Sequence, residues 1–145
     1  MYATLQNMLD RFGETEIAQL TDIGEVATGG VVQAVLDRAL EDADAEINGY
    51  LAARYTLPLT STPTLLVGIA SDIARYRLYR DQVSETVNAR YKAAVKLLEN
   101  IAAGKVSLGL DASSAPAPVS DSVHFGTPTR VFARDVESIT GTDDD

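Results

Sequence analysis

Acidic side chains recur along one face of the most regular stretch of the sequence. Asp37, Glu41 and Asp44 follow one another at intervals of four and three residues, which places them on one side of a helix. Helical bundles bind two metal ions when such acids are joined by Glu-x-x-His pairs. The single histidine, His124, lies far from this stretch, and no Glu-x-x-His occurs. The sequence therefore favours a solvated or interface face over a metal site, and we expect no cofactor.

Catalytic nucleophiles lack supporting residues in this sequence. Cysteine is absent, which excludes a cysteine nucleophile and thiolate metal ligands. No Gly-x-Ser-x-Gly elbow is present, and a serine triad would have to use His124. Gly29 and Gly30 precede a predicted helix, but the P-loop lysine and spacing are missing. We therefore predict that the protein is not an enzyme.

A group of arginines interleaved with tyrosines needs its own interpretation. Arg75, Arg77 and Arg80 alternate with Tyr76 and Tyr79, and such a mixture can bind nucleic acid through phosphate contacts and base stacking. The formal net charge of −9 argues against this, because phosphate binding needs an excess of Lys and Arg on the contact face. We favour core packing for the tyrosines and contacts with acids of a neighbouring subunit for the arginines.

Charge is unevenly distributed along the chain. Residues 1–61 carry ten acids and three arginines, a balance of −7, whereas residues 62–104 carry six bases and four acids, a balance of +2. Two interpretations remain open, namely ordinary solvated helix faces or two surfaces that attract each other in neighbouring subunits. The second interpretation predicts a subunit interface that contains Asp37, Glu41, Asp44, Arg77, Arg80 and Lys96.

The spacing of apolar residues predicts an all-α fold, a small helical bundle with an extended C-terminal tail. The strongest pattern runs through residues 31–55, where apolar residues recur every three or four positions. Two further main helices are predicted to begin at Pro63 and after Ser84, which serves as an N-cap. Short helices are predicted within residues 4–20, the first of them capped by Thr4. Short links between such helices favour a bundle.

One charged residue falls on a predicted inward face. Asp72 lies among Leu65, Ile69 and Ile73 when the second main helix is drawn in projection. A buried carboxylate without a partner is too costly to persist. Arg54 falls on the inward face of the preceding long helix by the same count, so we predict that Asp72 and Arg54 share a buried polar network.

The chain divides into three parts by composition. Residues 1–108 contain the helical periodicity and are the predicted domain, residues 109–121 form an Ala/Ser/Pro linker, and residues 122–145 form a C-terminal tail whose acidic end is predicted to be disordered. The tail has too few apolar residues to build a core, so we expect it to dock onto another surface. The predicted docking residues are Phe125, Arg130, Val131, Phe132 and Arg134.

Three motifs are specific enough to suggest a family. They are AEINGYLAARYTLPL at residues 45–59, Thr62-Pro63, and SDIARYRL at residues 71–78. Together they resemble the Mu-like bacteriophage family of small head-tail connector proteins. The resemblance covers residues 2 to about 108, and the phrase RVFARD at residues 130–135 is similar to the C-terminal end of that family.

The resemblance implies a structural virion protein, an adaptor whose ring, usually dodecameric, lies beneath the portal and joins capsid to tail. The implied partners are further copies of the chain, the portal protein, and a tail-completion (stopper) or tail-terminator protein, while DNA passes through the lumen without specific binding. An acidic channel suits such passage. The implied location is the virion neck, after synthesis in the host bacterial cytoplasm, with no membrane contact. The alternative is a small helix-turn-helix DNA-binding regulator, which the charge of −9 disfavours.

Overall fold

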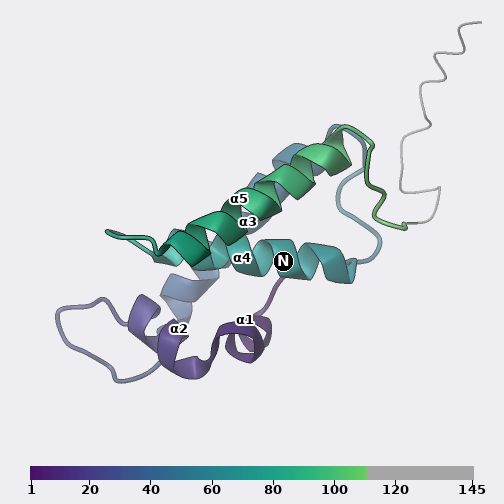
Figure 1. The fold of residues 1–145 in the computed structure, drawn as a ribbon. Coiled ribbons are helices and arrows are strands. Elements are labelled where there is room, and N and C mark those ends of the chain that lie inside the picture. Colours follow the sequence, from purple (N-terminus) through teal and green to yellow (C-terminus); the bar gives the residue numbers. More distant parts are fainter. Residues whose placement is uncertain (111–145) are drawn as a thin grey trace, which may run out of the picture.

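Five helices make up the part of the chain that the computed structural model describes, residues 1–110. They are α1 (Leu5–Phe12), α2 (Glu14–Thr21), α3 (Gln33–Leu51), α4 (Thr64–Leu78) and α5 (Glu85–Ala102). The three long helices α3, α4 and α5 pack on one another, and α1 and α2 cover one end of this bundle (Figure 1). The predicted all-α bundle with three main helices and short N-terminal ones is confirmed.

Helix α3 forms because its apolar residues return to one face at every turn. That face is buried at Leu36, Ala39, Leu40, Ala43, Ile47 and Leu51. The helix ends at Leu51, four residues before the predicted end at residue 55. The backbone N–H groups of Arg54 and Tyr55 both donate to the carbonyl of Leu51, which tightens the chain into a turn and buries the Tyr55 ring.

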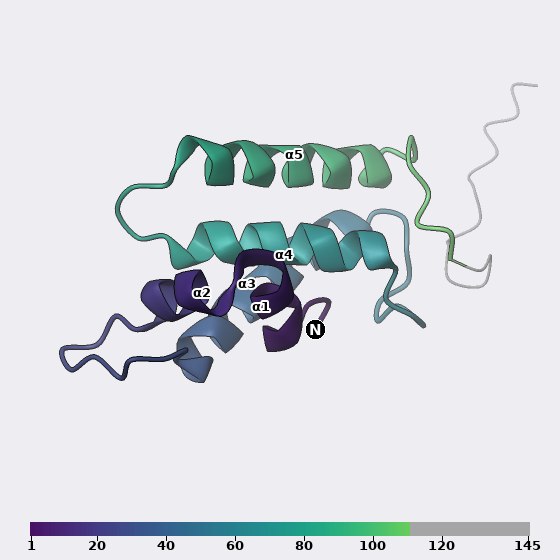
Figure 2. The ribbon, with the colours of Figure 1, turned by 60° about the horizontal axis from the view of Figure 1, so that its bottom comes forward.

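Helices α4 and α5 form an antiparallel pair. Figure 2 shows them side by side, joined by the loop of residues 79–84. The hydroxyl of Ser84 accepts a hydrogen bond from the N–H of Val87 at 3.3 Å, so the predicted N-cap of α5 is confirmed. The predicted N-cap of α1 is confirmed as well, since the Thr4 hydroxyl accepts from the N–H of Asn7.

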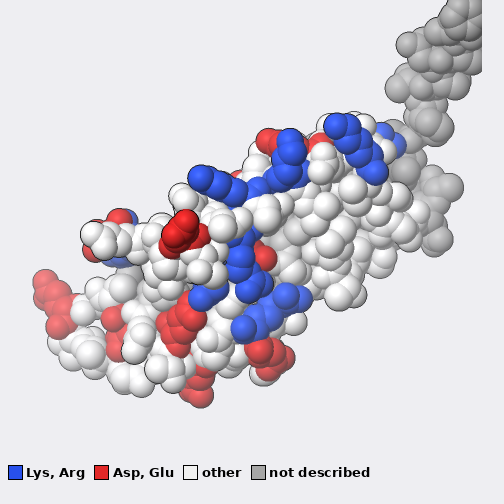
Figure 3. Space-filling model, viewed as in Figure 1, with Lys and Arg blue, Asp and Glu red and all other residues white. Residues whose placement is uncertain are grey.

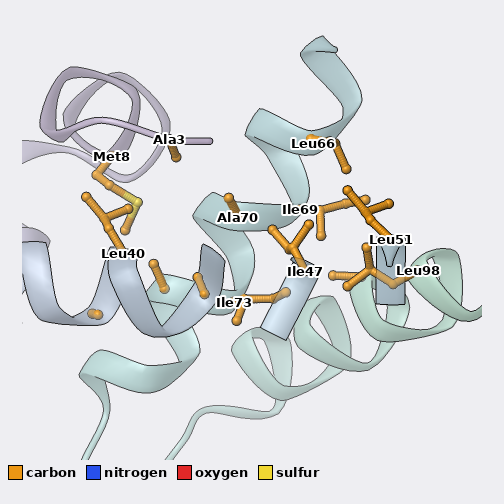
Figure 4. Close-up of a cluster of buried hydrophobic side chains, with 14 of the residues drawn as sticks. Ala3, Met8, Leu40, Ile47, Leu51, Leu66, Ile69, Ala70, Ile73 and Leu98 are labelled. Atoms are coloured by element: carbon orange, nitrogen blue, oxygen red, sulfur yellow. The ribbon is translucent and has the colours of Figure 1, made fainter. Parts of the chain in front are cut away.

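The core consists mainly of aliphatic side chains from all three long helices. Figure 4 shows Ile47 and Leu51 of α3 facing Ile69 of α4 and Leu98 of α5, while Met8 of α1 lies against Leu40. Burial of these side chains supplies the main stabilisation, about 1.5–3 kcal/mol for each large residue. The core therefore fixes how the helices lie and which faces they leave for contacts with other molecules.

The last described residues still pack against the helical domain. Leu108 is buried, and its N–H donates to the Tyr55 hydroxyl at 3.2 Å. Leu110 also packs against the core. Apart from Gly109 and Leu110, the predicted linker at residues 109–121 and the predicted tail at residues 122–145 lie outside the described residues.

Candidate subunit interface

An ion pair joins the end of α4 to the N-terminal helices. Nε of Arg75 donates to Oε1 of Glu16 in α2 at 2.6 Å, and the Tyr79 hydroxyl donates to the same oxygen at 3.3 Å. The Arg75 guanidinium also lies 4.5 Å above the ring of Phe12 in α1. Sequence reasoning missed the role of Glu16. Arg75 therefore holds α1 and α2 in place instead of facing a neighbouring molecule.

A second cluster joins all three long helices around one carboxylate. Glu46 of α3 accepts from Nη2 of Arg77 in α4 at 2.6 Å and from the hydroxyl of Tyr91 in α5 at 2.9 Å. The Tyr91 ring stacks on Tyr76, with ring centroids 4.0 Å apart and planes inclined by 8°. The only sequence signal for this cluster is the position of Glu46 near the edge of the apolar face of α3. Arg77 thus has an acidic partner within its own subunit.

Tyr91 gives this cluster a measurable pH dependence. Burial, and then the hydrogen bond to the Glu46 carboxylate, oppose the phenolate and raise the pKa of Tyr91 from 10.0 to about 12. Between these two values the unfolded chain releases the proton while the folded chain keeps it, so stability falls as pH rises. We expect Tyr91→Phe to lose less thermal stability than the wild type between pH 10 and pH 12, measured by circular dichroism. Equal losses in the two proteins would contradict this assignment.

The predicted network of Arg54 and Asp72 is wrong. Nε of Arg90 in α5 donates to Oδ1 of Asp72 in α4 at 2.9 Å, so the carboxylate is paired across the α4–α5 contact. Arg54 is exposed, and its guanidinium lies against Gly104, where an added Cβ would stand 1.6 Å from Nη1. The prediction failed because α3 ends at Leu51, so Arg54 does not continue the helical face on which the count placed it.

The predicted acidic stripe lies on α3, and two of its members have partners within the subunit. Asp44 accepts from the backbone N–H of Tyr2 at 2.9 Å, which anchors the N-terminal segment. Asp37 accepts from Nε2 of Gln33, one turn earlier, at 2.6 Å. Glu41 is exposed. Asp37 is half-buried and binds a neutral amide, which leaves its negative charge in place, so Asp37 and Glu41 are the candidates for contact with a neighbouring subunit.

The predicted basic interface residues also differ in whether they are paired within the subunit. Arg77 is held by Glu46, as described above, whereas Arg80 is exposed in the loop after α4. Lys96 is 73% exposed and lies 3.4 Å from Glu99 on its own helix, a pair of little energetic weight. Figure 3 shows Lys and Arg gathered over α4 and α5, while Asp and Glu lie mainly over α1, α2 and the loop that follows. The contact of these groups between subunits stays a prediction.

Comparison with known sequences assigns the family. The sequence profile described as "Bacteriophage Mu, Gp36" matches residues 2–126. The chain belongs to this Gp36 family. It is similar to "Gene product J" of Escherichia phage Mu, with 37% identity over 134 residues that cover 92% of this chain and 94% of that protein. It is also similar to "Mu-like prophage FluMu protein gp36" of Haemophilus influenzae, with 32% identity over 110 residues, 76% of this chain and 77% of the other.

The predicted resemblance to a Mu-like phage family is confirmed by these matches, and the Gp36 member described here is a phage protein. Residues 1–110 contain no group of three or more side chains arranged to bind a metal ion. In the same part of the chain, no helix is long and apolar enough to cross a membrane. The predicted docking residues Phe125, Arg130, Val131, Phe132 and Arg134 lie outside the described residues.

Proposed function

We propose that this protein is a structural head-tail connector of a Mu-like phage, a ring beneath the portal that joins capsid to tail. The observation that carries the proposal is a helical subunit with its basic and acidic side chains on different parts of its surface. Such a subunit is suited to heterologous contacts, in which one surface meets a different surface of the next copy, and repeated contacts of this kind form a ring when the rotation between neighbours closes. Neither a cofactor nor catalysis has a part in this role.

Internal ion pairs support the proposal because they make the subunit a rigid building block. Arg75 ties α4 to α2, Arg77 ties α4 to α3, and Arg90 ties α5 to α4. Each of these arginines is already paired with a carboxylate of its own subunit, which reduces the positive charge that a DNA-binding regulator would need on its contact face and weakens that alternative. The net charge of −9 fits a channel through which DNA passes without specific binding.

The proposed partners follow from this role. Copies of the chain would form the ring. Residues 122–136 would dock onto the portal or an adjacent subunit. A tail-completion or tail-terminator protein would bind the opposite side of the ring. We place the ring in the virion neck.

Charge reversal on α3 tests the interface between copies. We expect the double variant Asp37→Lys, Glu41→Lys to assemble poorly into rings, because both side chains would then face the bases of the neighbouring subunit. Each exposed pair contributes only about 0–1 kcal/mol, so the pairs set the register of the contact more than its strength. Light scattering and negative-stain images of the protein mixed with portal would measure assembly.

The matched control is Asp10→Lys, Asp81→Lys, which changes the net charge equally at exposed positions away from α3. We expect this variant to assemble like the wild type. Unchanged assembly of the α3 variant would remove Asp37 and Glu41 from the interface.

Deletion of the gene from its phage or prophage tests the function itself. After induction we expect lysates that contain DNA-filled heads and finished tails that are not joined, together with a loss of infectious particles that the gene supplied on a plasmid restores. Electron microscopy distinguishes this result from its rivals. Joined, infectious particles would refute the connector function, and a failure to transcribe phage genes would favour the regulator instead.

A further inference from the structure

An apolar groove runs along the surface between α4 and α5. Its lining comes mainly from apolar residues and glycine, and it also includes the ion-paired side chains of Asp72 and Arg90. The other lining residues are Leu65, Gly68 and Ile69 of α4 and Ala93, Ala94 and Leu97 of α5. The Leu65 side chain is 39% exposed although it is large and apolar. Figure 3 shows an uncharged area over this half of the two helices, bordered by basic side chains. Covering such a surface with another apolar group is favourable, so the groove is a candidate contact surface.

The loop between α2 and α3 carries exposed apolar side chains. Val26 in this loop, residues 22–32, is 82% exposed, and Ile23 is exposed as well. The loop is held at its base, because the Asp22 carboxylate accepts from the N–H groups of Thr28 and Gly29, each at 2.9 Å. The loop thus holds its apolar tip in solvent in an ordered conformation, so less conformational entropy is lost when the loop binds a partner.

The charges around the two surfaces are complementary. Within the loop the charged residues are Asp22 and Glu25, and it contains no base. In the groove lining, Arg90 pairs with Asp72 and keeps a side chain that is 47% exposed. The Arg11 guanidinium lies at Gly68, 3.6 Å from the position that a Cβ there would take. An acidic loop that entered the groove would therefore meet Arg11, together with Arg90 and its partner Asp72, beside an apolar floor.

The two surfaces lie apart on the same subunit. Figures 1 and 2 both show the loop projecting beyond α2, away from the N-terminal half of α4 where Leu65 lies. A subunit is therefore not placed to fill its own groove with its own loop. Two different surfaces that fit each other on separate copies make a heterologous contact, the kind that a ring requires.

We propose that the loop of residues 22–32 in one subunit inserts Val26 into the α4–α5 groove of the next, with Glu25 facing Arg11 and Arg90. The inference rests on the proposed ring and names the contact that holds it together. The loop-groove contact also adds binding strength, which the exposed ion pairs on α3 do not supply. Burial of apolar surface provides strength, at about 25 cal/mol for each square ångström removed from water, whereas exposed pairs set register.

Disulfide trapping tests the contact, because the chain contains no cysteine of its own. We expect the full-length double variant Val26→Cys, Ala93→Cys, assembled with portal and then oxidised, to give a ladder of covalent multimers on non-reducing gels. Both positions are exposed, so neither change disturbs the core. The matched control is Val26→Cys, Lys92→Cys. It moves the second cysteine by one position, out of the groove lining and into a different hollow on α5, and we expect no ladder from it.

The outcomes separate this inference from the proposed function. Rings in negative-stain images without a ladder, or with an equal ladder in the control, would overturn the loop-groove contact and leave the connector function standing. Absence of any ring with portal would overturn both. A third variant, Ala93→Cys, Phe125→Cys, tests whether the C-terminal segment occupies the groove. Efficient trapping there in place of Val26 would assign the groove to the C-terminal segment and overturn the proposal.

A charge swap provides an independent readout. We expect Glu25→Arg to weaken ring assembly about tenfold, since it places a third cation beside Arg11 and Arg90. Adding Arg11→Glu to that variant should restore most of the loss, which a merely structural effect of either change would not do. No effect of Glu25→Arg, or no restoration in the double variant, would contradict the pairing.

Discussion

Truncation after Leu110 is expected to leave the helical domain folded and to abolish the joining of heads to tails. Leu108 is buried and hydrogen-bonded to Tyr55, and Leu110 packs against the core, so a chain that ends at Leu110 keeps these contacts. The predicted docking residues all follow it in the sequence. Circular dichroism should therefore give the truncated chain the same melting temperature as the full-length protein. Complementation of a phage that lacks the gene should yield a titre lower by several orders of magnitude.

The matched control is a chain truncated after Thr140, which removes the acidic end of residues 141–145 but keeps the predicted docking residues. We expect that chain to restore the titre. A normal titre from the shorter chain would show that the tail is dispensable. Loss of the folded state would instead show that residues beyond Leu110 belong to the domain.

The Ile47→Ala variant is expected to show a large loss of stability, about 2–5 kcal/mol in the free energy of unfolding. Ile47 is fully buried at the point where α3 meets α4 and α5, beside Ile69 and Leu98 (Figure 4). Truncation leaves a cavity that the close-packed helices cannot fill, and the loss is a substantial part of the stability of a small domain. Urea denaturation followed by circular dichroism measures it.

Leu65→Ala is the matched control, because it removes a similar side chain that is 39% exposed. We expect a clearly smaller loss of stability from it. If both variants unfolded at the same urea concentration, Ile47 would not hold the central place in the core that the structure gives it.

Local sequence signals predicted the helices well because each helix carries its own period and cap. At Thr4 and Ser84 the side-chain oxygen accepts a hydrogen bond from an N–H three residues later, a local interaction that the residue type and position predict. The end of α3 was predicted too late. Neither Gly nor Pro marks Leu51, and the chain leaves the helix there as the Tyr55 ring is buried, which depends on tertiary packing.

The ion pairs could not be predicted in the same way. A helical projection gives the face on which Asp72 lies, but not which neighbouring helix covers that face. Its partner Arg90 comes from the antiparallel α5, whose register against α4 is set by the loop of residues 79–84 and by packing. The sequence shows Glu46 only as an acid near the edge of the apolar face of α3, although Arg77 and Tyr91 both bind it. Pairing between helices is a property of the assembled bundle.

The position of this protein in the virion tests most directly whether it is a connector ring beneath the portal. Cryo-electron microscopy of the phage neck should show a ring of five-helix subunits directly beneath the portal, with the loop of residues 22–32 of each copy against α4 and α5 of the next. A resolved neck in which no density fits the fold of residues 1–110, or a position of the protein elsewhere in the particle, would contradict the account.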